Sequence, residues 1–479
     1  MMILRFLFFL LILCSVSSAA YRNSNEKVPA FPREFRAAWV ACVYNIDWPS
    51  KPGLSASTQK QQLIQLLDKA ASLKLNAIIF QVRPNADAVY YSSIEPYSSW
   101  ISGTMGKSSG YDPLKFCIEQ AHARGIEVHA WFNPFRALPN KSMYAAPNHV
   151  SKKYPSMCKD YLNYTWMFPS RSDAQSHSLR VIADVVRRYN VDGVHIDDYF
   201  YPYPKLGAGG VELSRFPDGL SNAKRRGHIN DFVKNMYSMV KGIKPHVRVG
   251  ISPFGIWKPG VPSGIEATLN AYEHIAADSR KWLQNGWCDY MSPQLYWRIK
   301  PAKQSFTSLL QWWRSQGSRP VWPGIATSRI NSSEDPGRPA SEILNQVAYS
   351  RSIGKNWVGH IHWSMESLMK NKGGISSSLA STTYLSPALV PPMPWISKTA
   401  PAKPVIAAGS SGNQTLIKWS PVATATKYAI QARVGNKWYA VQVVPAGRTE
   451  TRISGTPNAI AVTAVNALGN SSPAATVSQ

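Results

Sequence analysis

The sequence predicts a (β/α)8 TIM barrel followed by a small all-β sandwich. Eight short apolar runs alternate with stretches of helical period between residues 36 and 363, and polar or aromatic residues follow most of the runs. Eight alternating units favour a closed parallel barrel, whose functional groups lie at the carboxyl ends of its strands. After residue 403 the helical period is lost, and short alternating runs separated by turn residues predict the sandwich.

The predicted strands are residues 37–43, 77–82, 127–132, 193–196, 247–251, 290–295, 321–325 and 358–363. The helices predicted between them are residues 58–73, 113–124, 174–189, 223–243, 271–284, 305–316 and 340–353, with Ser57 and Asp112 at N-cap positions. A last helix, within residues 371–383, would be short. A doubly wound open sheet is the alternative, but residues 43–47 are not the Gly-rich phosphate loop that its first strand requires.

The two ends of the chain lie outside the predicted barrel. Residues 1–20 have the pattern of a secretory signal peptide, because Arg5 precedes an apolar run and small residues suited to cleavage follow it. The run is too short to span a membrane, so we expect a soluble mature protein without an integral membrane segment, which is secreted, periplasmic or in the cell envelope. We predict the barrel domain at residues 31–385, a stiff Pro-rich linker at residues 386–403 and the sandwich at residues 404–479.

The charge of the chain predicts an anionic partner. The formal net charge is +26, from 53 Lys and Arg against 27 Asp and Glu. We find no basic recognition helix, finger or RNP-like strand, so we expect no nucleic acid and favour an anionic cell envelope. The 17 Trp and 22 Tyr favour a polysaccharide, since flat aromatic faces pack on sugar rings. Cys42, Cys117, Cys158 and Cys288 permit disulfides without implying them.

The main catalytic candidates lie at the end of the fourth predicted strand, where Asp197 and Asp198 follow an apolar run and precede Tyr199. Alternation along the strand directs His195 and Asp197 into the barrel. We therefore expect Asp197 at the barrel mouth as the nucleophile or base, with Asp198 beside it as a positioning group. The alternative is that both carboxyls only cap the following turn.

A glycoside hydrolase needs a second carboxyl group that acts as an acid. Adjacent side chains of a strand point apart, so we do not expect Asp197 and Asp198 to form the pair. Asp278, in the helical stretch after the fifth strand, and Glu366, after the eighth, are the candidates for the acid. For Asp278, an ion pair with a basic neighbour on a helix surface is an equal alternative.

Further polar and aromatic residues follow the other strands and would meet at one ligand. The predicted substrate-binding residues are Trp39, Asp47, Gln81, Arg83, Asp87, His129, Asn133, Arg136, Tyr199, Gln294, Tyr296, Trp297 and Trp363. Gln81 or Gln294 taken alone is more often a satisfied core amide, so the prediction depends on the convergence of the set. For Asp87 we expect a contact with a sugar hydroxyl or an effect on the acidity of Asp197.

A metal site is a competing interpretation. His129, His195, His360 and His362 fall on or near the third, fourth and eighth strands, with Asp197 among them. Against it, the first strand has no His-x-His pair, and an outward orientation of the two histidines on the eighth strand would remove them from the site. We therefore predict no metal and no cofactor.

Seven motifs follow one another along residues 33–385. They are Phe-Arg-Ala-Ala-Trp-Val at 35–40, Phe-Gln-Val-Arg-Pro at 80–84, His-Ala-Trp-Phe-Asn-Pro-Phe-Arg at 129–136, Val-Asp-Gly-Val-His-Ile-Asp-Asp-Tyr-Phe-Tyr at 191–201, Gly-Ile-Ser-Pro-Phe-Gly at 250–255, Asp-Ser-Arg-Lys-Trp at 278–282 and Pro-Gln-Leu-Tyr-Trp at 293–297. Together they resemble the bacterial glycosyl-hydrolase-like 10 family. The resemblance implies a TIM-barrel glycosidase of the cell envelope, with Asp197 and Asp198 at the family's paired acids. Its divisome-localised member implies peptidoglycan glycan as the substrate and carries Gln at the position of His195, which weakens the metal interpretation.

The C-terminal segment resembles a fibronectin type III module through its motifs at residues 418–421, 428–430 and 462–469. The combined expectation is a secreted or periplasmic glycoside hydrolase that cleaves a bacterial envelope glycan, with peptidoglycan strands as the expected substrate, by chemistry with two carboxyl groups. The alternatives are a non-catalytic glycan-binding envelope protein and a metal-dependent barrel hydrolase.

Overall fold

The computed structural model describes residues 21–479, and the predicted signal peptide lies outside the described residues. The described chain forms two compact units. Residues 33–396 form one, and residues 21–32 together with residues 397–479 form the other. Between residues 21 and 479, no helix combines the length and the apolar composition that crossing a membrane requires.

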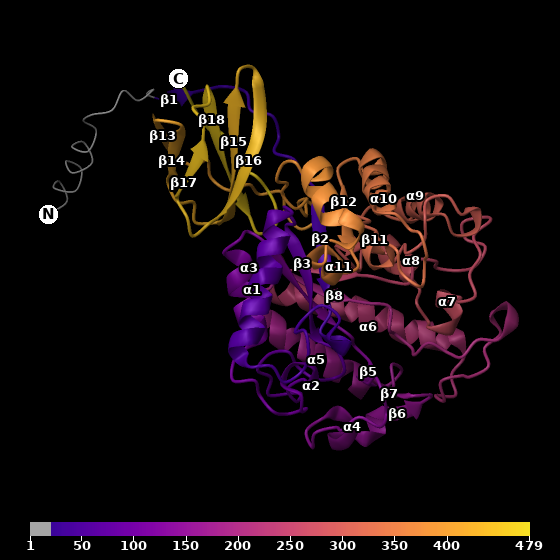
Figure 1. Cartoon of the computed structure of the whole chain (residues 1–479). Coiled ribbons are helices and arrows are strands. Elements are labelled where there is room, and N and C mark those ends of the chain that lie inside the picture. The colour runs from indigo at the N-terminus through magenta and orange to yellow at the C-terminus, as the bar shows by residue number, and fades with distance from the viewer. Residues whose placement is uncertain (1–20) are drawn as a thin grey trace. The chain divides into compact units, whose positions relative to one another are not determined.

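The larger unit contains the predicted parallel barrel (Figure 1). Its strands are β2 (Phe35–Val40), β3 (Ala77–Arg83), β4 (Glu127–Phe132), β8 (Gly193–Ile196), β9 (Arg248–Ile251), β10 (Tyr290–Met291), β11 (Gly324–Ile325) and β12 (Gly359–His362). Their order in the sheet is β10-β9-β8-β4-β3-β2-β12-β11. Parallel bridges from Met291 to Val321 and from Gln294 to Gly324 close the sheet between β10 and β11. The (β/α)8 prediction is confirmed.

The strands are buried on both faces, as expected for a parallel sheet covered by helices. Val194 and Ile196 pack in the layer between the sheet and the helices. His195 contacts Tyr290 in the barrel interior, where an aromatic cluster includes Phe35. The alternation predicted along the fourth strand is therefore confirmed from Val194 to Ile196.

The helices that alternate with the strands are α1 (Ala56–Ser72), α3 (Pro113–His122), α5 (Ser172–Arg188), α6 (Asn222–Ile243), α8 (Ser279–Gln284), α9 (Phe306–Ser315) and α10 (Ala340–Ile353). The N-cap of α1 is Ser55, whose hydroxyl accepts a hydrogen bond from the backbone N–H of Thr58 at 3.2 Å. The prediction of Ser57 is wrong because the helix begins earlier than its apolar period. Asp112 caps α3 as predicted, with a bond of 2.9 Å from the backbone N–H of Lys115.

Three segments differ from the predicted pattern. Between β4 and α5, β5 (Arg136–Leu138), β6 (Cys158–Tyr161) and β7 (Tyr164–Met167) form an antiparallel sheet in the order β5-β7-β6, with α4 (Val150–Lys153) preceding β6. The helix predicted at residues 271–284 is broken into α7 (Ala271–His274) and α8, because Ala276 has a positive φ of 57°. After β12 the chain forms α11 (Met365–Met369) and α12 (Ile375–Ser378), which is short as predicted.

The first part of the predicted linker packs with the barrel unit, which extends to residue 396. The carbonyl of Ser386 accepts a hydrogen bond from the Arg36 guanidinium at 2.8 Å. The carbonyl of Pro391 accepts one from Arg248 at 2.8 Å, and Val390 between them is buried. Proline removes backbone donors but keeps the carbonyl acceptors, so arginine side chains can hold such a segment against the barrel.

The smaller unit is an all-β sandwich, as predicted. One antiparallel sheet contains β13 (Ile406–Ser411), β14 (Gln414–Trp419) and β17 (Glu450–Ser454), and the other contains β15 (Ala425–Val434), β16 (Lys437–Pro445), β18 (Ala459–Asn466) and β19 (Ala475–Ser478). The second sheet gains β1 (Arg22–Ser24), which pairs with β19 and is too short to show a period in the sequence. Trp419, Tyr428 and Ile430 lie in the core between the two sheets of the sandwich. The fibronectin type III resemblance stays a prediction.

Candidate active site

A cavity of about 220 Å³ opens at the carboxyl ends of the barrel strands. Residues on or just after β2, β4, β8, β9, β10 and β12 line it, and they are Trp39, Trp131, Asp197, Asp198, Tyr199, Ser252, Gln294, Tyr296 and Trp363. Its carboxyl groups therefore stand among aromatic rings and amides. This combination suits a polar ligand with flat apolar faces, such as a sugar ring.

Asp197 is held by donors from the neighbouring strand. The indole N–H of Trp131 donates to Oδ2 of Asp197 at 3.1 Å, and the amide of Asn133 lies 3.5 Å from Oδ1. Burial and the negative charge of Asp198 raise the pKa of Asp197 to about 7, although Arg136 acts in the opposite direction. Asp197 is therefore able to hold a proton near neutral pH.

Asp198 faces a different set of partners. The hydroxyl of Tyr203 donates to its Oδ2, and the Gln294 side chain also forms a hydrogen bond with it. Burial raises the pKa of Asp198, while these two hydrogen bonds favour the ionised form. Asp198 lies beside Asp197, as expected, and both line one cavity, although their side chains were expected to point apart. β8 ends at Ile196, so strict alternation does not extend to the two acids.

Arg136 lies behind these acids and orients the aromatic wall. Its guanidinium stands 4.7 Å from the centre of the Tyr199 ring and donates to the Pro84 carbonyl at 3.2 Å. Its positive charge lowers the pKa of both Asp197 and Asp198. Arg136 does not line the cavity. Arg136 thus acts on the site through the two acids and Tyr199, and its predicted contact with substrate stays a prediction.

Residues 34–336 match the family described as Glycosyl hydrolase-like 10. The chain belongs to this glycosyl hydrolase-like 10 family. It is 38% identical over 458 residues to Glycosyl hydrolase YngK of Bacillus subtilis (strain 168), a match that covers 91% of this chain and 89% of that protein. It is 32% identical over 336 residues to Glycosyl hydrolase DigH of Escherichia coli (strain K12), covering 63% of this chain and 76% of that protein.

Among solved structures, the PgaB (BpsB) glycoside hydrolase domain of Bordetella bronchiseptica is similar with a TM-score of 0.48 and 14% identity, over 73% of this chain and 98% of that chain. This likeness is too low to carry an argument about the site. Family membership assigns the chain to the glycosidases, as predicted from its motifs.

Gln81 and Asp47, two of the predicted substrate-binding residues, form hydrogen bonds with the backbone of the loop after β2. Oε1 of Gln81 accepts hydrogen bonds from the backbone N–H groups of Cys42 and Val43 at 3.1 and 3.0 Å. Oδ2 of Asp47 accepts a bond of 2.8 Å from the N–H of Ala41. Burial raises the pKa of Asp47 to about 7. Neither side chain lines the cavity, so what the structure gives both is a part in fixing this loop, and their predicted contact with substrate stays a prediction.

Arg83 belongs to a buried ion-pair network. Its guanidinium contacts both carboxylate oxygens of Glu95 at 2.5 and 2.8 Å, and His177 contacts the same carboxylate at 2.8 Å. Asp87 is also buried, and Oδ1 accepts a bond of 2.9 Å from the backbone N–H of Asn85. Neither Arg83 nor Asp87 lines the cavity, and their contacts with a sugar stay predictions.

The predicted histidines lie in two separate places. Nδ1 of His129 and Nδ1 of His195 stand 2.8 and 2.9 Å from the hydroxyl of Tyr290 in the barrel interior. His362 stands 2.8 Å from the hydroxyl of Thr327, and neither it nor His360 lines the cavity. Within residues 21–479, no three His, Cys, Asp or Glu side chains gather as a metal site would require.

The two candidates for the partner acid stand apart from the cavity lining. Asp278 is half-buried at the start of α8 and its side chain forms no capping bond. Glu366 forms an i,i+4 ion pair with Lys370 at 2.5 Å, and its backbone N–H donates to Asp47. Trp297 packs edge-on against Phe254 and likewise lies outside the lining.

Three residues of the site were not among those predicted from the sequence. Trp131 lies two residues after His129 on β4, so both side chains point to the same face of the sheet, and this alternation could have indicated that Trp131 points into the barrel. Ser252 directly follows β9 and its hydroxyl stands 2.8 Å from Nε2 of His195. Tyr203 contacts Asp198 from the irregular loop after β8, and no periodic signal marks it.

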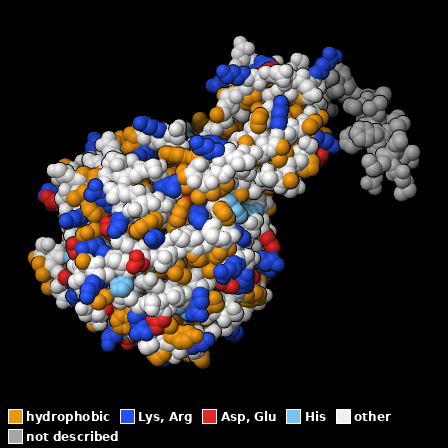
Figure 2. Space-filling model, turned by 180° about the vertical axis from the view of Figure 1, so that it is seen from behind, with side chains coloured by type: hydrophobic (Ala, Val, Ile, Leu, Met, Phe, Trp, Pro, Cys, Tyr) orange, Lys and Arg blue, Asp and Glu red, His pale blue; other side chains and the backbone are white. Residues whose placement is uncertain are grey.

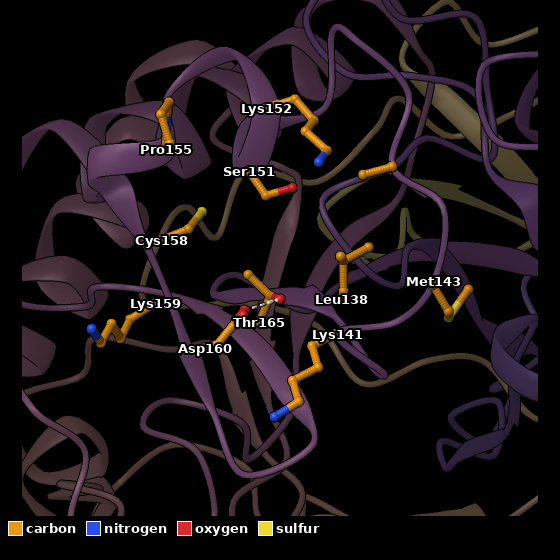
Figure 3. A pocket seen from close by; sticks show the side chains of 11 residues that line it. Leu138, Lys141, Met143, Ser151, Lys152, Pro155, Cys158, Lys159, Asp160 and Thr165 are labelled. Atoms are coloured by element: carbon orange, nitrogen blue, oxygen red, sulfur yellow. Dashed lines mark hydrogen bonds between the residues drawn. The ribbon is translucent and has the colours of Figure 1, made fainter.

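A second cavity, of about 430 Å³, lies beside the antiparallel sheet that follows β4 (Figure 3). Its lining residues are Leu138, Lys141, Met143, Ala145, Ser151, Lys152, Pro155, Cys158, Lys159, Asp160 and Thr165. Asp160 is the one carboxylate in this lining, and Oδ1 accepts a hydrogen bond of 2.6 Å from the hydroxyl of Thr165. The cavity therefore presents more positive than negative charge. Cys158 there and the other described cysteines are free thiols.

Proposed function

We propose that this family member cleaves glycan strands of the bacterial cell envelope, with peptidoglycan as the substrate, and that Asp197 and Asp198 are its two catalytic carboxyl groups. The observation that carries the proposal is their presence in one buried, aromatic-walled cavity, where they are 4% and 6% exposed. Hydrolysis of a glycosidic bond requires one carboxyl to donate a proton and another to act as nucleophile or base.

The electrostatics support a division of roles. The charge of Asp198 raises the pKa of Asp197, so the pair retains one proton on Asp197 when Asp198 is already ionised. Asp197 then donates its proton to the leaving oxygen, and Asp198 attacks the sugar or activates water. The hydrogen bonds from Tyr203 and Gln294 stabilise the Asp198 carboxylate. This division differs from the sequence prediction, which made Asp197 the nucleophile or base and Asp198 a positioning group.

Charge and sequence support the envelope as the place of action. Lysine and arginine side chains outnumber acidic ones on the face shown in Figure 2, in line with the net charge of +26. The lysine-lined second cavity adds a local site for an anionic group. The signal-like residues 1–20 support export, which N-terminal sequencing of the mature protein would test through cleavage after Ala19 or Ala20.

Release of soluble fragments from purified sacculi, with and without prior removal of the peptides, tests the proposal. We expect the wild type to release oligosaccharides, and Asp197→Asn and Asp198→Asn each to reduce the rate by about 100- to 10,000-fold while binding persists. Asp278→Asn and Glu366→Gln are matched controls, because they make the same change outside the cavity lining.

The outcomes separate the alternatives. Binding of sacculi by the wild type without any release would favour a non-catalytic glycan-binding protein. Loss of activity with a chelator would favour the metal-dependent hydrolase. If Asp278→Asn or Glu366→Gln abolished activity as fully as Asp197→Asn, the proposed pair would be wrong.

A further inference from the structure

The loop after β2 holds a tyrosine outward in an unfavourable backbone conformation. Tyr44 is 59% exposed and has φ 53° and ψ 15°, and the next residue, Asn45, has φ 52°. Asparagine tolerates this left-handed region, whereas a bulky residue such as tyrosine seldom adopts it. Such strain persists only where surrounding contacts impose it, and it concentrates at binding and catalytic sites.

Those contacts surround Tyr44 on both sides. On one side, the amide oxygen of the buried Gln81 accepts hydrogen bonds from the backbone N–H groups of Cys42 and Val43, the two residues before Tyr44. The Asn45 side chain donates to the carbonyls of Pro49 and Trp100 at 3.0 and 2.9 Å. The polar groups of the loop are thus used to fix its backbone, and the Tyr44 ring is left facing outward.

The Tyr44 ring stands beside a second aromatic ring. Its centre lies 5.0 Å from that of Trp100, at an interplanar angle of 58°, and Trp100 belongs to the short helix α2 (Ser99–Ser102). Trp100 packs on the aromatic cluster that contains Trp39 and Trp131, two residues of the active-site wall. The pair of rings is thus connected to the cavity wall through this cluster, and Tyr44 lies in the loop that follows β2, at the same end of the barrel as the cavity.

We propose that Tyr44 and Trp100 form an additional glycan subsite, which stacks on a sugar ring of the chain beyond the ring at the cleaved bond. The exposed Tyr44 ring and the partly buried Trp100 ring offer apolar surface to the C–H groups of a sugar, and tyrosine and tryptophan provide it with little loss of side-chain freedom. The inference rests on the proposed function, and it names where a long chain is held.

Kinetics on peptide-free oligosaccharides of alternating N-acetylglucosamine and N-acetylmuramic acid, of increasing length, would test the subsite. We expect Tyr44→Ala to raise KM for long strands about tenfold with kcat unchanged, and to leave KM for the shortest cleaved oligosaccharide unaffected. Tyr44→Phe should keep the wild-type KM, because it retains the ring. Tyr91→Ala is the control, since Tyr91 is 45% exposed and its ring pairs with that of Tyr97, outside this cluster.

Equal KM values for Tyr44→Ala and the wild type on long strands would overturn the subsite, and so would an equal loss at every length or the same effect from Tyr91→Ala. Thermal unfolding of each variant identifies a folding defect. If the wild type cleaves none of these glycans, the proposed function fails separately. Calorimetric affinities for the same oligosaccharides then decide the subsite, with weaker binding by Tyr44→Ala supporting it and equal or absent binding rejecting it.

Discussion

The indole N–H of Trp131 donates to Oδ2 of Asp197 at 3.1 Å and joins the ends of two neighbouring strands. In the register of β4 and β8, Trp131 stands opposite His195, two residues before the acid. The bond favours the ionised form of Asp197 and so opposes the burial that raises its pKa. The acidity of Asp197 therefore depends on this indole.

The pH dependence of cleavage should follow the proton on Asp197. Its pKa is raised to about 7, so activity that needs a protonated Asp197 falls as pH rises through about 7. Trp131→Phe keeps an aromatic ring but removes the N–H donor, which should raise the pKa of Asp197 further and move this alkaline limb to higher pH. We also expect kcat to fall about 10- to 100-fold, the cost of one hydrogen bond to a charged group. A profile of kcat/KM against pH tests both, and a limb that stays or moves to lower pH would contradict the role of the indole.

The buried carboxyl group of Asp197 should lower the free energy of unfolding at neutral pH, because burial disfavours its ionised form. A carboxyl whose pKa rises from 3.8 unfolded to about 7 folded favours folding fully below pH 3.8, and this contribution is lost as pH rises through 7. Asp197→Asn removes the titration and should raise the free energy of unfolding above pH 7 by at most about 4 kcal/mol relative to wild type. The gain should vanish below about pH 4. Urea unfolding at several pH values measures it, and a gain that does not vary with pH would refute the buried charge as its cause.

The network of Arg83, Glu95 and His177 should matter for stability and not for catalysis. Burial opposes ionisation of Glu95, yet the charge of Arg83 and the hydrogen bonds it receives lower its pKa to about 2. Glu95→Gln leaves a buried guanidinium without its partner and should destabilise the fold by about 3–5 kcal/mol. The stabilisation is present above pH 4.5 and lost as pH falls towards 2, so the difference from wild type should shrink in acid.

Chemical denaturation and kcat of the folded fraction measure the two effects of Glu95→Gln separately. Glu119→Gln is the control, because Glu119 is an exposed glutamate on α3 of the same barrel. If Glu95→Gln lowered kcat without changing the free energy of unfolding, the network would act in catalysis, and Arg83 would be a substrate-binding residue as predicted.

The barrel could be predicted because its signals are repeated and local. Eight alternations of apolar run and helical period specify the topology, and the parity of Val194, His195 and Ile196 assigns their faces. The cavity lining was predicted in part, since Trp39 and Trp363 lie on or directly after strands. Where regular structure ends, parity ends too, so strand alternation gave no reason to expect both acids to face one cavity as a pair.

Polar residues at strand ends carry an ambiguity that sequence alone does not resolve. Gln81 satisfies backbone N–H groups and Arg83 satisfies a carboxylate, while Gln294 lines the cavity and bonds Asp198. All three occur in the same context, a polar side chain closing an apolar run. Which of them reaches a ligand depends on loops that differ in length and have no period. Tyr44 illustrates the reverse case, since its exposure follows from a loop conformation that no pattern marks.

The lysine-lined second cavity should contribute to binding of anionic wall polymers. Lys141, Lys152 and Lys159 approach it from different segments, and Asp160 is the one carboxylate in its lining (Figure 3). Replacing the three lysines by glutamate should weaken binding to insoluble, peptide-free glycan and reduce the salt dependence of that binding, because fewer ion contacts remain to be screened. Cleavage of the shortest soluble oligosaccharide should not change, since none of the three lines the catalytic cavity.

The matched control for the lysine cavity replaces Lys115, Lys224 and Lys234, which are exposed on α3 and α6 of the barrel unit and do not line the cavity, by glutamate. It makes the same change in net charge, so a merely global attraction would weaken binding equally in both triple variants. We expect the cavity variant to lose about tenfold more affinity than the control at low ionic strength, the equivalent of one or two partly screened ion contacts. Co-sedimentation with the glycan at increasing salt measures the difference, and equal losses in the two variants would reduce the cavity to part of the overall basic surface.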